Sequence, residues 1–334
     1  MKPLNEQQLR NLLRPYDLTP VDVRPLGGGR EDSDGIVYAF DRNGAPMAIK
    51  LMAYEEPAER FADTVAGYEE RARFARYLSE SGAAIVGPVP DGSGALYRAG
   101  RQDDLTCISY LMPRVAGANP PPESWDETFY RAWGRAVGRM HRLATAWPEF
   151  RHSRSMDADG TALISWRREI SFFQGLCRDD AVSAAWAEMQ AQLDTLPVER
   201  SGFGFIHNDP HGNNLLYDGH SLHMIDFDVA NYHWFVTDLP IAAQSVLFVK
   251  SGGMERPLTD PAELWEFLRA FLGGYREEYD LDAAWLARLD LFLQYRRLLL
   301  FTVMQDWLDT NAQVRDGWKA MIAAAPAVLC PLLD

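Results

Sequence analysis

The feature that most constrains this chain is a dense polar stretch set between short apolar segments. Residues 205–217 read FIHNDPHGNNLLY, and residues 223–228 follow as HMIDFD. The alternation of apolar and turn-forming residues predicts two short strands with Asp209, Asn214 and Asp226 on the flanking loops. Side chains on such loops converge instead of spreading along one helix face. The pattern therefore predicts a polar site built from one segment of the chain.

The residue types and spacings of this stretch fit phosphoryl transfer. That chemistry needs a carboxylate to orient an attacking hydroxyl and accept its proton, and oxygen ligands for magnesium. Asn214 follows Asp209 by five residues and Asp226 follows it by 17, the intervals typical of a kinase catalytic loop and its metal-binding aspartate. The alternative is that Asp209 and Asn214 are only turn residues, since Asn, Asp, Gly and Pro gather in loops for local reasons.

The length of the chain indicates how many domains it forms, and its net charge indicates which kinds of ligand it can bind. The chain has 334 residues, with 33 basic and 47 acidic side chains and a net charge of −14. Its length suits about two domains at roughly 150 residues each. The acidic balance argues against nucleic-acid binding, which relies on Lys and Arg to neutralise phosphates. A cationic substrate suits it better.

No targeting or redox feature stands out. The N-terminal segment lacks the apolar core of a signal peptide, and no run approaches the roughly 20 apolar residues of a membrane helix. Three cysteines, Cys107, Cys177 and Cys330, lie far apart without the spacing of a disulfide framework or zinc knuckle. We therefore expect a protein of the cytoplasm that does not bind a membrane.

The pattern of apolar residues changes along the chain. The first hundred or so residues predict an antiparallel sheet with one inserted helix, and the remainder predicts long helices interrupted by two short strands. We place the boundary between residues 1–112 and 113–334 and expect a ligand in the cleft between such lobes. The predicted strands are 21–26, 36–40, 46–52, 84–88, 95–98, 106–112, 214–217 and 222–226. The predicted helices are 5–13, 58–81, 125–145, 163–177, 182–196, 261–277 and 281–309.

The chain resembles the aminoglycoside phosphotransferase and choline kinase family, whose members carry HxDxxxxN followed by a strand ending in IDF or IDW. Here this reads His207, Asp209 and Asn214, then Ile225-Asp226-Phe227. The resemblance implies an α+β, protein-kinase-like fold with two lobes. It also implies that Asp209 is the catalytic carboxylate and that Asn214 and Asp226 bind magnesium. His207 is expected to orient the catalytic loop by hydrogen bonds.

Further pieces of the family pattern occur in the same order. The segment 47–50 (MAIK) resembles the strand that ends in the phosphate-holding lysine, Lys50, and it follows the glycines 27–29. Gly28 and Gly29 are thus expected to face the nucleotide phosphates. The resemblance makes Glu70 the ion-pair partner of Lys50, with Glu69 the alternative because helix register is not fixed by sequence. A lysine in an otherwise apolar strand needs such a partner or a phosphate.

The segment that joins the two lobes in the family also has a similar counterpart in this chain. Residues 108–117 (ISYLMPRVAG) resemble the family's hinge, which implies that Met112 backs the adenine pocket and that Pro113 and Val115 lie against the base. Residues 133–141 resemble a family helix that ends in Leu-His.

Departures from the pattern are also visible. Glu31, Asp32 and Asp34 follow the glycines, where carboxylates would repel a triphosphate, and Asp228 stands where protein kinases have Gly. The latter departure, with no APE segment, speaks against a protein kinase with a phosphorylated activation loop. Histidine pairs at 207/211 and 220/223 suggest zinc only weakly, because neither pair is predicted on a helix face. No Gly-x-Ser-x-Gly elbow supports a hydrolase.

The resemblance implies transfer of the γ-phosphate of ATP, with Mg²⁺, to a hydroxyl of a small molecule, one that bears a cationic amine being favoured. The family's acceptors include aminoglycosides, amino alcohols and homoserine. Two alternatives are a bacterial stress-type protein Ser/Thr kinase and a non-catalytic nucleotide-binding relative. ATP against GTP, the role of Asp228 and the oligomeric state stay open. We expect the C-terminal helices to form the acceptor wall, which would draw on Tyr275, Glu277, Glu278, Tyr295, Asp306, Trp307 and Asp309.

Overall fold

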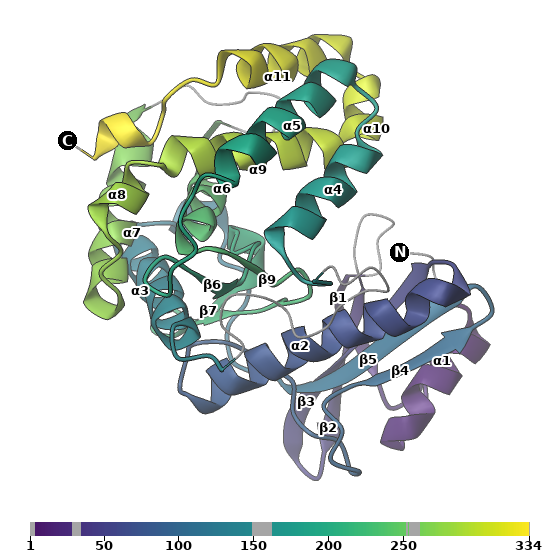
Figure 1. Cartoon of the computed structure of the whole chain (residues 1–334). Helices are drawn as coiled ribbons and strands as arrows, with labels where there is room; N and C mark the ends of the chain where they lie inside the picture. Colours follow the sequence, from purple (N-terminus) through teal and green to yellow (C-terminus); the bar gives the residue numbers. More distant parts are fainter. Residues whose placement is uncertain (1–3, 29–34, 149–161, 252, 254–260, 334) are drawn as a thin grey trace. The chain divides into compact units, whose positions relative to one another are not determined.

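The structure is a computed structural model that describes residues 4–28, 35–148, 162–251, 253 and 261–333 (Figure 1). The chain divides into two compact units: the first runs through Ala116 and the second begins at Gly117. Each unit is described by itself. Within the described ranges, no helix is both long enough and apolar enough to cross a membrane.

The first unit is built on a five-stranded antiparallel sheet with strand order β1-β2-β3-β5-β4. The chain turns tightly between β2 and β3 at Asn43 and Gly44, which both have positive φ, as a two-residue hairpin requires. The strands are β1 (Arg24–Gly28), β2 (Ile36–Arg42), β3 (Ala45–Glu55), β4 (Arg98–Gln102) and β5 (Leu105–Pro113).

A helix packs on each face of this sheet. Leu12 and Leu13 of α1 (Glu6–Leu13) pack with Ile49 and Leu51 of β3 on one face. Tyr68 and Ala72 of α2 (Phe61–Glu80), together with Met52, form the cluster on the other. Because side chains alternate along a strand, Lys50 shares the face of Met52, beneath α2. The short 3-10 helices of this unit are η1 (Arg14–Tyr16) and η2 (Ala58–Arg60).

Two predicted strands of this unit were wrong. Residues 84–88 form no strand; the neighbouring Val89 makes an isolated bridge to Leu111. Pro88 and Pro90 explain this, because proline lacks the N–H that a ladder needs. The strand predicted at 95–98 begins only at Arg98, since the preceding residues turn around the carboxylate of Asp91, which accepts hydrogen bonds from the backbone N–H groups of Ser93 and Ala95.

The second unit is mainly helical and contains two small hairpins. β6 (Phe203–Ile206) pairs with β9 (Asn231–Trp234), and β7 (Leu215–Tyr217) pairs with β8 (Leu222–Met224). The helices are α3 (Glu127–Ala144), α4 (Trp166–Leu176), α5 (Asp180–Leu193), α6 (Asp238–Ser251), α7 (Pro261–Glu278), α8 (Ala283–Leu286), α9 (Leu289–Val303), α10 (Gln305–Asp309) and α11 (Ala312–Ala324). The 3-10 helices are η3 (Pro122–Ser124), η4 (Gly212–Asn214), η5 (Phe235–Thr237) and η6 (Cys330–Leu332).

Three features of this unit differ from the prediction. The single helix expected at 281–309 is three helices, because the backbone leaves helical geometry at Arg288 and Met304. Helix α6 was missed because its apolar residues are spread around the helix instead of forming one stripe. The hairpin of β6 and β9 was missed because two four-residue apolar segments carry no periodic signal.

Glycines let α3 and α7 pack backbone against backbone. A Cβ at Gly134 of α3 would lie 1.9 Å from the carbonyl oxygen of Phe271, and one at Gly274 of α7 would lie 2.0 Å from that of Arg131. Figure 1 shows the two helices side by side. The glycines in the 133–141 segment thus have a packing role that fixes the position of α3.

We expect Gly134→Ala to lower the free energy of unfolding by about 3 kcal/mol, because the methyl group forces two packed helices apart. Urea denaturation followed by circular dichroism measures the change. Gly317→Ala on α11 is the matched control, since a Cβ there meets no atom within 4 Å. Equal denaturation midpoints for the two variants would contradict the close packing.

Candidate active site

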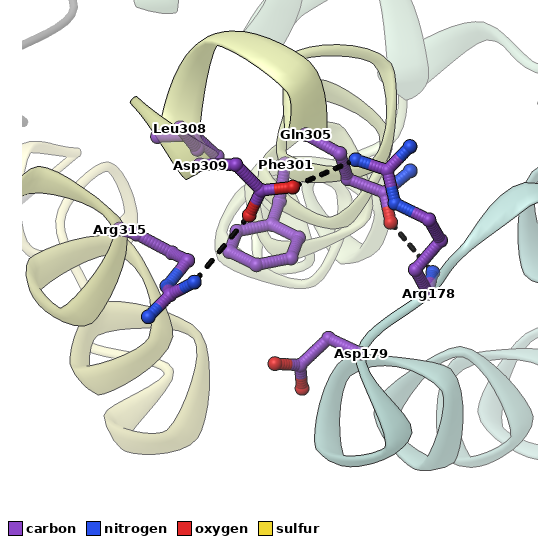
Figure 2. A pocket seen from close by; sticks show the side chains of 7 residues that line it. All are labelled: Arg178, Asp179, Phe301, Gln305, Leu308, Asp309 and Arg315. Atoms are coloured by element: carbon purple, nitrogen blue, oxygen red, sulfur yellow. Dashed lines mark hydrogen bonds and ion pairs between the residues drawn. The ribbon is translucent and has the colours of Figure 1, made fainter. Parts of the chain in front are cut away.

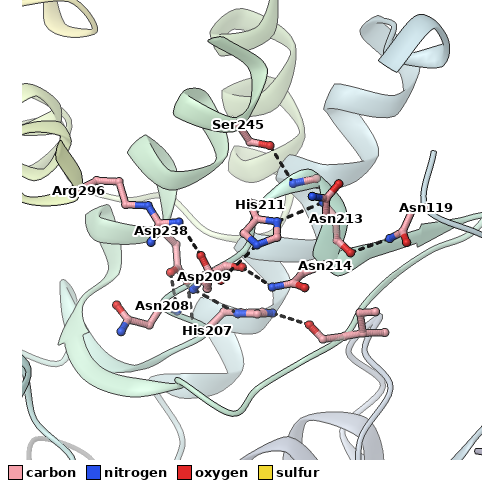
Figure 3. Close-up of polar contacts among 12 residues, drawn as sticks. Asn119, His207, Asn208, Asp209, His211, Asn213, Asn214, Asp238, Ser245 and Arg296 are labelled. Atoms are coloured by element: carbon pink, nitrogen blue, oxygen red, sulfur yellow. Dashed lines mark hydrogen bonds and ion pairs between the residues drawn. The ribbon is translucent and has the colours of Figure 1, made fainter. Parts of the chain in front are cut away.

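The polar stretch singled out in the sequence forms the loop between β6 and β7 and the turn after β8. Figure 3 shows His207, Asn208, Asp209 and Asn214 on this segment with their polar contacts. Leu215 pairs with Met224, and the backbone N–H of Ile225 donates to the carbonyl of Asn214 at 2.9 Å. The hairpin therefore brings Asn214 beside the residue that precedes Asp226.

The backbone of the loop is held by Asp238, the first residue of α6. Its fully buried carboxylate accepts hydrogen bonds from the backbone N–H groups of His207 (3.2 Å) and Asn208 (2.9 Å). These donors lie directly before Asp209, so the carboxylate fixes the path of the chain into that residue (Figure 3). A buried carboxylate with this many donors is well satisfied.

The same carboxylate extends the network to α3 and α7. His141 Nε2 lies 3.0 Å from Asp238 Oδ2, and His141 Nδ1 lies 2.8 Å from the Tyr275 hydroxyl. Burial raises the pKa of Tyr275 well above its usual range, so its hydroxyl stays protonated. The imidazole of His141 joins this hydroxyl to the carboxylate of Asp238. A chain of buried hydrogen bonds thus runs from the helix pair to the loop.

A second carboxylate holds the loop from α4. Glu169 accepts hydrogen bonds from the side-chain amides of Asn208 and Asn231 and from the Tyr295 hydroxyl. Asn208 has φ 68°, in the left-handed region that asparagine tolerates better than most residues. The backbone reversal at Asn208 is therefore fixed from both its N–H and its side chain.

The carboxylate of Asp209 contacts an arginine and a histidine. Its Oδ1 lies 2.7 Å from Arg296 Nη2 of α9, and its Oδ2 lies 3.2 Å from His211 Nε2. Burial alone would raise the pKa of Asp209, but Arg296 and then His211 outweigh it and hold the pKa well below its usual range. The side chain is 25% exposed, so an ionised carboxylate is open to a ligand.

His207 links the loop to the turn that carries Asp226. Its Nε2 lies 3.0 Å from the carbonyl of Ile225, and its Nδ1 accepts from the backbone N–H of Asp209 at 3.3 Å. The ring is fully buried and packs on Phe227. Both ring nitrogens of His207 thus lie within hydrogen-bond distance of backbone groups of the loop and of the Asp226 turn.

The oxygen atoms at Asn214 and Asp226 suit magnesium. The Asn214 amide nitrogen donates to the carbonyl of Asp209 at 3.0 Å, which leaves its amide oxygen as an acceptor for a cation. Asp226 has φ 69°, so its backbone reverses directly after β8. In the described part of the chain, no three His, Cys, Asp or Glu residues gather as metal ligands. Two oxygen donors completed by water and phosphate are a usual magnesium arrangement.

The first unit holds the residues expected to contact the nucleotide. Lys50 and Glu70 are both buried, 4% and 1% exposed, and lie on the face of the sheet covered by α2. Glu69 is exposed and accepts a hydrogen bond from the Tyr97 hydroxyl at 3.4 Å. This register favours Glu70 over Glu69 as the partner of Lys50.

The glycines and the hinge are only partly described. Gly28 has φ 75°, and a Cβ there would lie 2.1 Å from the carbonyl oxygen of Gly35, so the end of the hairpin requires glycine. Gly29, Glu31, Asp32 and Asp34 lie outside the described residues. Met112 and Pro113 end β5 opposite Ala48 and Met47, and all three expected hinge residues, with Val115, are half-buried.

A pocket of about 260 Å³ opens beside Asp209 within the second unit. His211 and Arg296, which contact the carboxylate of Asp209, also line this pocket. Its apolar lining comes from Trp125, Ile241, Phe248, Val249 and Leu300, and its polar lining from His211, Asn213, Gln244, Ser245 and Arg296. The pocket is therefore separated from the Asp209 carboxylate by no more than the side chains of His211 and Arg296, which contact both.

The acidic residues proposed for an acceptor wall lie elsewhere. Glu277 pairs with Arg131 and Arg135, and Glu278 pairs with Arg139 and Arg142. Tyr275 and Tyr295 are buried in the hydrogen-bond networks that hold the loop. None of these residues lines the pocket beside Asp209.

Asp309 lines a separate pocket of about 220 Å³, shown in Figure 2. There it forms ion pairs with Arg178 and Arg315, and Asp306 also pairs with Arg178. Trp307 is 36% exposed and does not line this pocket. The charges in this second pocket are compensated by one another, so it has no evident preference for an ion.

Comparison with known proteins decides the family. Residues 22–281 match the family described as "Phosphotransferase enzyme family". The chain belongs to the phosphotransferase enzyme family. The match includes Lys50, the loop at Asp209 and most of the helices around it, so it confirms the predicted family and class of enzyme, a phosphotransferase acting on small molecules.

Individual members of the phosphotransferase family support this assignment. Amicoumacin kinase of Bacillus subtilis (strain 168) is 27% identical over 326 residues, covering 95% of this chain and 90% of its own length. A solved structure of amicoumacin kinase hAmiN in complex with AMP-PNP, Ca²⁺ and Ami has a TM-score of 0.75 at 24% identity, covering 93% and 90%. A microcompartment-associated aminopropanol kinase has a TM-score of 0.64 at 18% identity, covering 95% and 94%. These similarities confirm the predicted α+β, protein-kinase-like fold.

Four residues that hold the loop or contact Asp209 were not identified as site residues from the sequence. They are His141, Glu169, Asp238 and Arg296. Asp238 carried a usable signal, because an aspartate that starts an apolar helix differs in polarity from the residues around it. Arg296 carried none: one arginine in the amphipathic α9 looks like any solvent-facing residue.

Proposed function

We propose that this chain transfers the γ-phosphate of ATP to a hydroxyl group of a small molecule, with Asp209 orienting that hydroxyl and accepting its proton. The observation that carries the proposal is the Asp209 carboxylate, whose pKa is held well below its usual range on a loop whose backbone is fixed by Asp238. Arg296 and His211, which contact this carboxylate, line a neighbouring pocket. Phosphoryl transfer to a hydroxyl needs a carboxylate that is ionised and held in position.

The remaining roles follow the chemistry of each side chain. Lys50 would hold the α- and β-phosphates with Glu70 as its partner, and Gly28, Gly29, Met112, Pro113 and Val115 would contact the nucleotide. Asn214 and Asp226 would hold Mg²⁺, which neutralises charge on the phosphates when bound. His207 keeps the loop and the Asp226 turn in register through its two backbone hydrogen bonds. The proposed contacts of Met112, Pro113 and Val115 with the base are inferred from the resemblance to the family.

The names of relatives support both the donor and the acceptor class. One similar structure is of an amicoumacin kinase in complex with AMP-PNP, Ca²⁺ and Ami, and another is named an aminopropanol kinase. We propose ATP and Mg²⁺ for this chain on the same grounds. An amine-bearing alcohol is the acceptor class to test first, since the net charge of −14 attracts cations to the protein.

Titration calorimetry of Mg-ATP into the wild type and into Asp226→Ala tests the nucleotide site. We expect magnesium-dependent binding that weakens at least tenfold in the variant, because one of two protein ligands to the cation is lost. Asp218→Ala is the matched control: the same substitution in the β7–β8 turn, where the carboxylate only accepts from the backbone N–H groups of His220 and Ser221.

The outcomes separate the alternatives. Equal ATP binding by wild type and Asp226→Ala would contradict the metal role. No binding of ATP or GTP by the wild type would overturn the kinase assignment. Binding with no phosphate transfer to any small alcohol, but with transfer to a protein, would favour the protein kinase alternative. Binding with no transfer at all would favour a non-catalytic relative.

A further inference from the structure

Three large apolar side chains are exposed on the two helices that hold the loop at Asp209. On α4, Phe172 is 59% exposed and Leu176 is 50% exposed, and on α9, Val303 is 60% exposed. Single exposed apolar residues are common on protein surfaces, whereas a contiguous group of them marks a binding site. The contacts of α4 and α9 place these side chains on one surface.

The two residues of α4 share a face with the side chain that reaches the loop. Glu169 accepts a hydrogen bond from the side-chain amide of Asn208. Phe172 and Leu176 follow Glu169 by three and seven residues. Residues at this spacing lie on one face of a helix, about 5 and 10 Å further along its axis. The apolar face of α4 therefore begins at the loop.

Helix α9 repeats the same arrangement. Arg296 donates to the carboxylate of Asp209 at 2.7 Å. Leu299, which is half-buried, and Val303 follow Arg296 by three and seven residues. They therefore lie on the face of α9 from which Arg296 reaches Asp209.

The two helices lie side by side and run in the same direction. Near their starts, the Tyr295 hydroxyl donates to Glu169. Just beyond their ends, the side-chain oxygen of Gln305 accepts from the backbone N–H of Arg178 at 2.6 Å (Figure 2). The side-chain nitrogen of Gln305 donates to the carbonyl of Leu176 at 3.2 Å. The apolar faces of α4 and α9 are therefore neighbours along their length.

Helix α5 covers the opposite side of this pair. Trp186 of α5 stacks on Phe173 at 6.2 Å between ring centroids, and its Nε1 donates to Thr302 Oγ1 at 3.1 Å. Phe172 precedes Phe173, whereas Val303 follows Thr302, each by about 100° of rotation. In two helices that run in the same direction, these opposite rotations lead to the same side, away from α5. The side chains on that side, here called the α4–α9 strip, are Phe172, Leu176, Leu299 and Val303.

The charged side chains at the two ends of the α4–α9 strip are already paired. Arg296 pairs with Asp209 at one end, and Arg178 pairs with Asp306 at the other. The strip itself carries no charge, so an ammonium group would gain nothing from it. An aromatic or branched alkyl group would gain from leaving water on this surface.

We propose that the α4–α9 strip binds an aromatic or branched alkyl group of the acceptor whose hydroxyl lies at Asp209. The inference rests on the proposed function and specifies the acceptor class. The acceptor is an alcohol with an apolar group about 5 to 10 Å from its hydroxyl, the span of the strip along the two helices. A small molecule is the occupant because the strip begins at Glu169 and Arg296, the side chains that contact the loop.

Ligand-detected NMR on the full chain tests the strip without relying on turnover. Ethanolamine and N-benzylethanolamine carry the same hydroxyl and the same positive charge, and only the second has an apolar ring. We expect the wild type to bind N-benzylethanolamine at least about tenfold more tightly than ethanolamine, because the ring leaves water on the strip. Phe172→Ala and Val303→Asn should each reduce this preference to about threefold or less.

The matched control for Val303→Asn is Val21→Asn. Val21 lies in the first unit and is 92% exposed, so this variant should keep the wild-type preference. The comparison of the two probes on the wild type needs no variant and stands even if a variant fails to fold.

Three results would overturn the inference. The first is equal affinity of the wild type for the two probes, and the second is a preference that persists in both strip variants. The third is a dimer, seen by light scattering, that both strip variants abolish, because the strip would then be covered by a second copy of the chain. Mg-ATP titration of the same samples reports separately on the proposed function: loss of Mg-ATP binding by the wild type contradicts that function, whatever the probes show.

Discussion

Asp209→Asn should reduce turnover by about 100- to 10,000-fold, the usual contribution of a positioned general base. The amide keeps the shape of the side chain and a hydrogen bond from Arg296, but it cannot accept the proton of the acceptor hydroxyl. Affinity for Mg-ATP should stay within about twofold of wild type, since Asp209 is not among the residues proposed to hold the nucleotide. ADP release in a coupled assay and titration calorimetry measure the two quantities.

The low pKa of Asp209 adds a pH dependence with a definite sign. A carboxyl group whose pKa is lowered in the folded protein is ionised at every pH above that value, so protonation removes the base only in strong acid. The ratio of wild-type to Asp209→Asn turnover should therefore stay constant from pH 8 down to pH 5.5. A ratio that falls with pH in this interval would mean that Asp209 titrates in its usual range.

The matched control for Asp209→Asn is Asp194→Asn. Asp194 is also paired with an arginine, Arg167, but lies on the surface and is 40% exposed. An exposed pair of this kind contributes little to stability, so this variant should keep wild-type turnover. Turnover by Asp209→Asn close to that of Asp194→Asn would show that the base has been assigned wrongly.

Asp238→Ala should lower the free energy of unfolding by about 3–5 kcal/mol and turnover by about 100-fold. The stability loss follows from removing the carboxylate that satisfies two buried backbone N–H groups and the imidazole of His141. The turnover loss follows from the loop, because a displacement of about 1 Å in a reacting group costs roughly two orders of magnitude. Chemical denaturation and kcat of the folded fraction measure the two effects.

Asp290→Ala separates a positioning role from a purely structural one. Asp290 also accepts three backbone hydrogen bonds, from Val328, Leu329 and Cys330, but these lie near the C-terminus and away from the loop. Both variants should lose stability, and only Asp238→Ala should lose kcat at a temperature where each is folded. Equal kcat values for Asp238→Ala and Asp290→Ala would show that Asp238 contributes to stability and does not position the loop.

The local features of the site were predictable from the order of residues. Strands predicted at 214–217 and 222–226 are present, and their pairing brings Asn214 beside the turn at Asp226. The alternation of β3 also places Lys50 on the face beneath α2, and the register of that helix then buries Glu70 and exposes Glu69. The sequence did not show whether Glu69 or Glu70 of α2 faces the sheet, because the rotation of a helix about its axis depends on how it packs.

The partners of the loop were not predictable in the same way. Asp238 lies 30 residues from Asn208 in sequence, Glu169 lies 39 away, and Arg296 lies 87 away from Asp209. No local spacing relates these residues, because their contacts exist only once α4, α6 and α9 have packed around the loop. The same holds for the amine-binding wall predicted on the C-terminal helices. Glu277 and Glu278 of α7 form ion pairs with arginines of α3, and the sequence of α7 gives no sign of these partners.

The order of residues was enough to infer the family, the fold class and the short segment that carries Asp209, Asn214 and Asp226. These depend on spacings of a few residues, and covalent connectivity enforces such spacings whatever the rest of the chain does. The sequence alone does not show that Asp238 holds the backbone of the loop or that Arg296 holds the pKa of Asp209 below its usual range; these follow from the packed structure. These depend on burial and on charges brought together by packing, and desolvation and Coulomb interactions act through space, not along the chain.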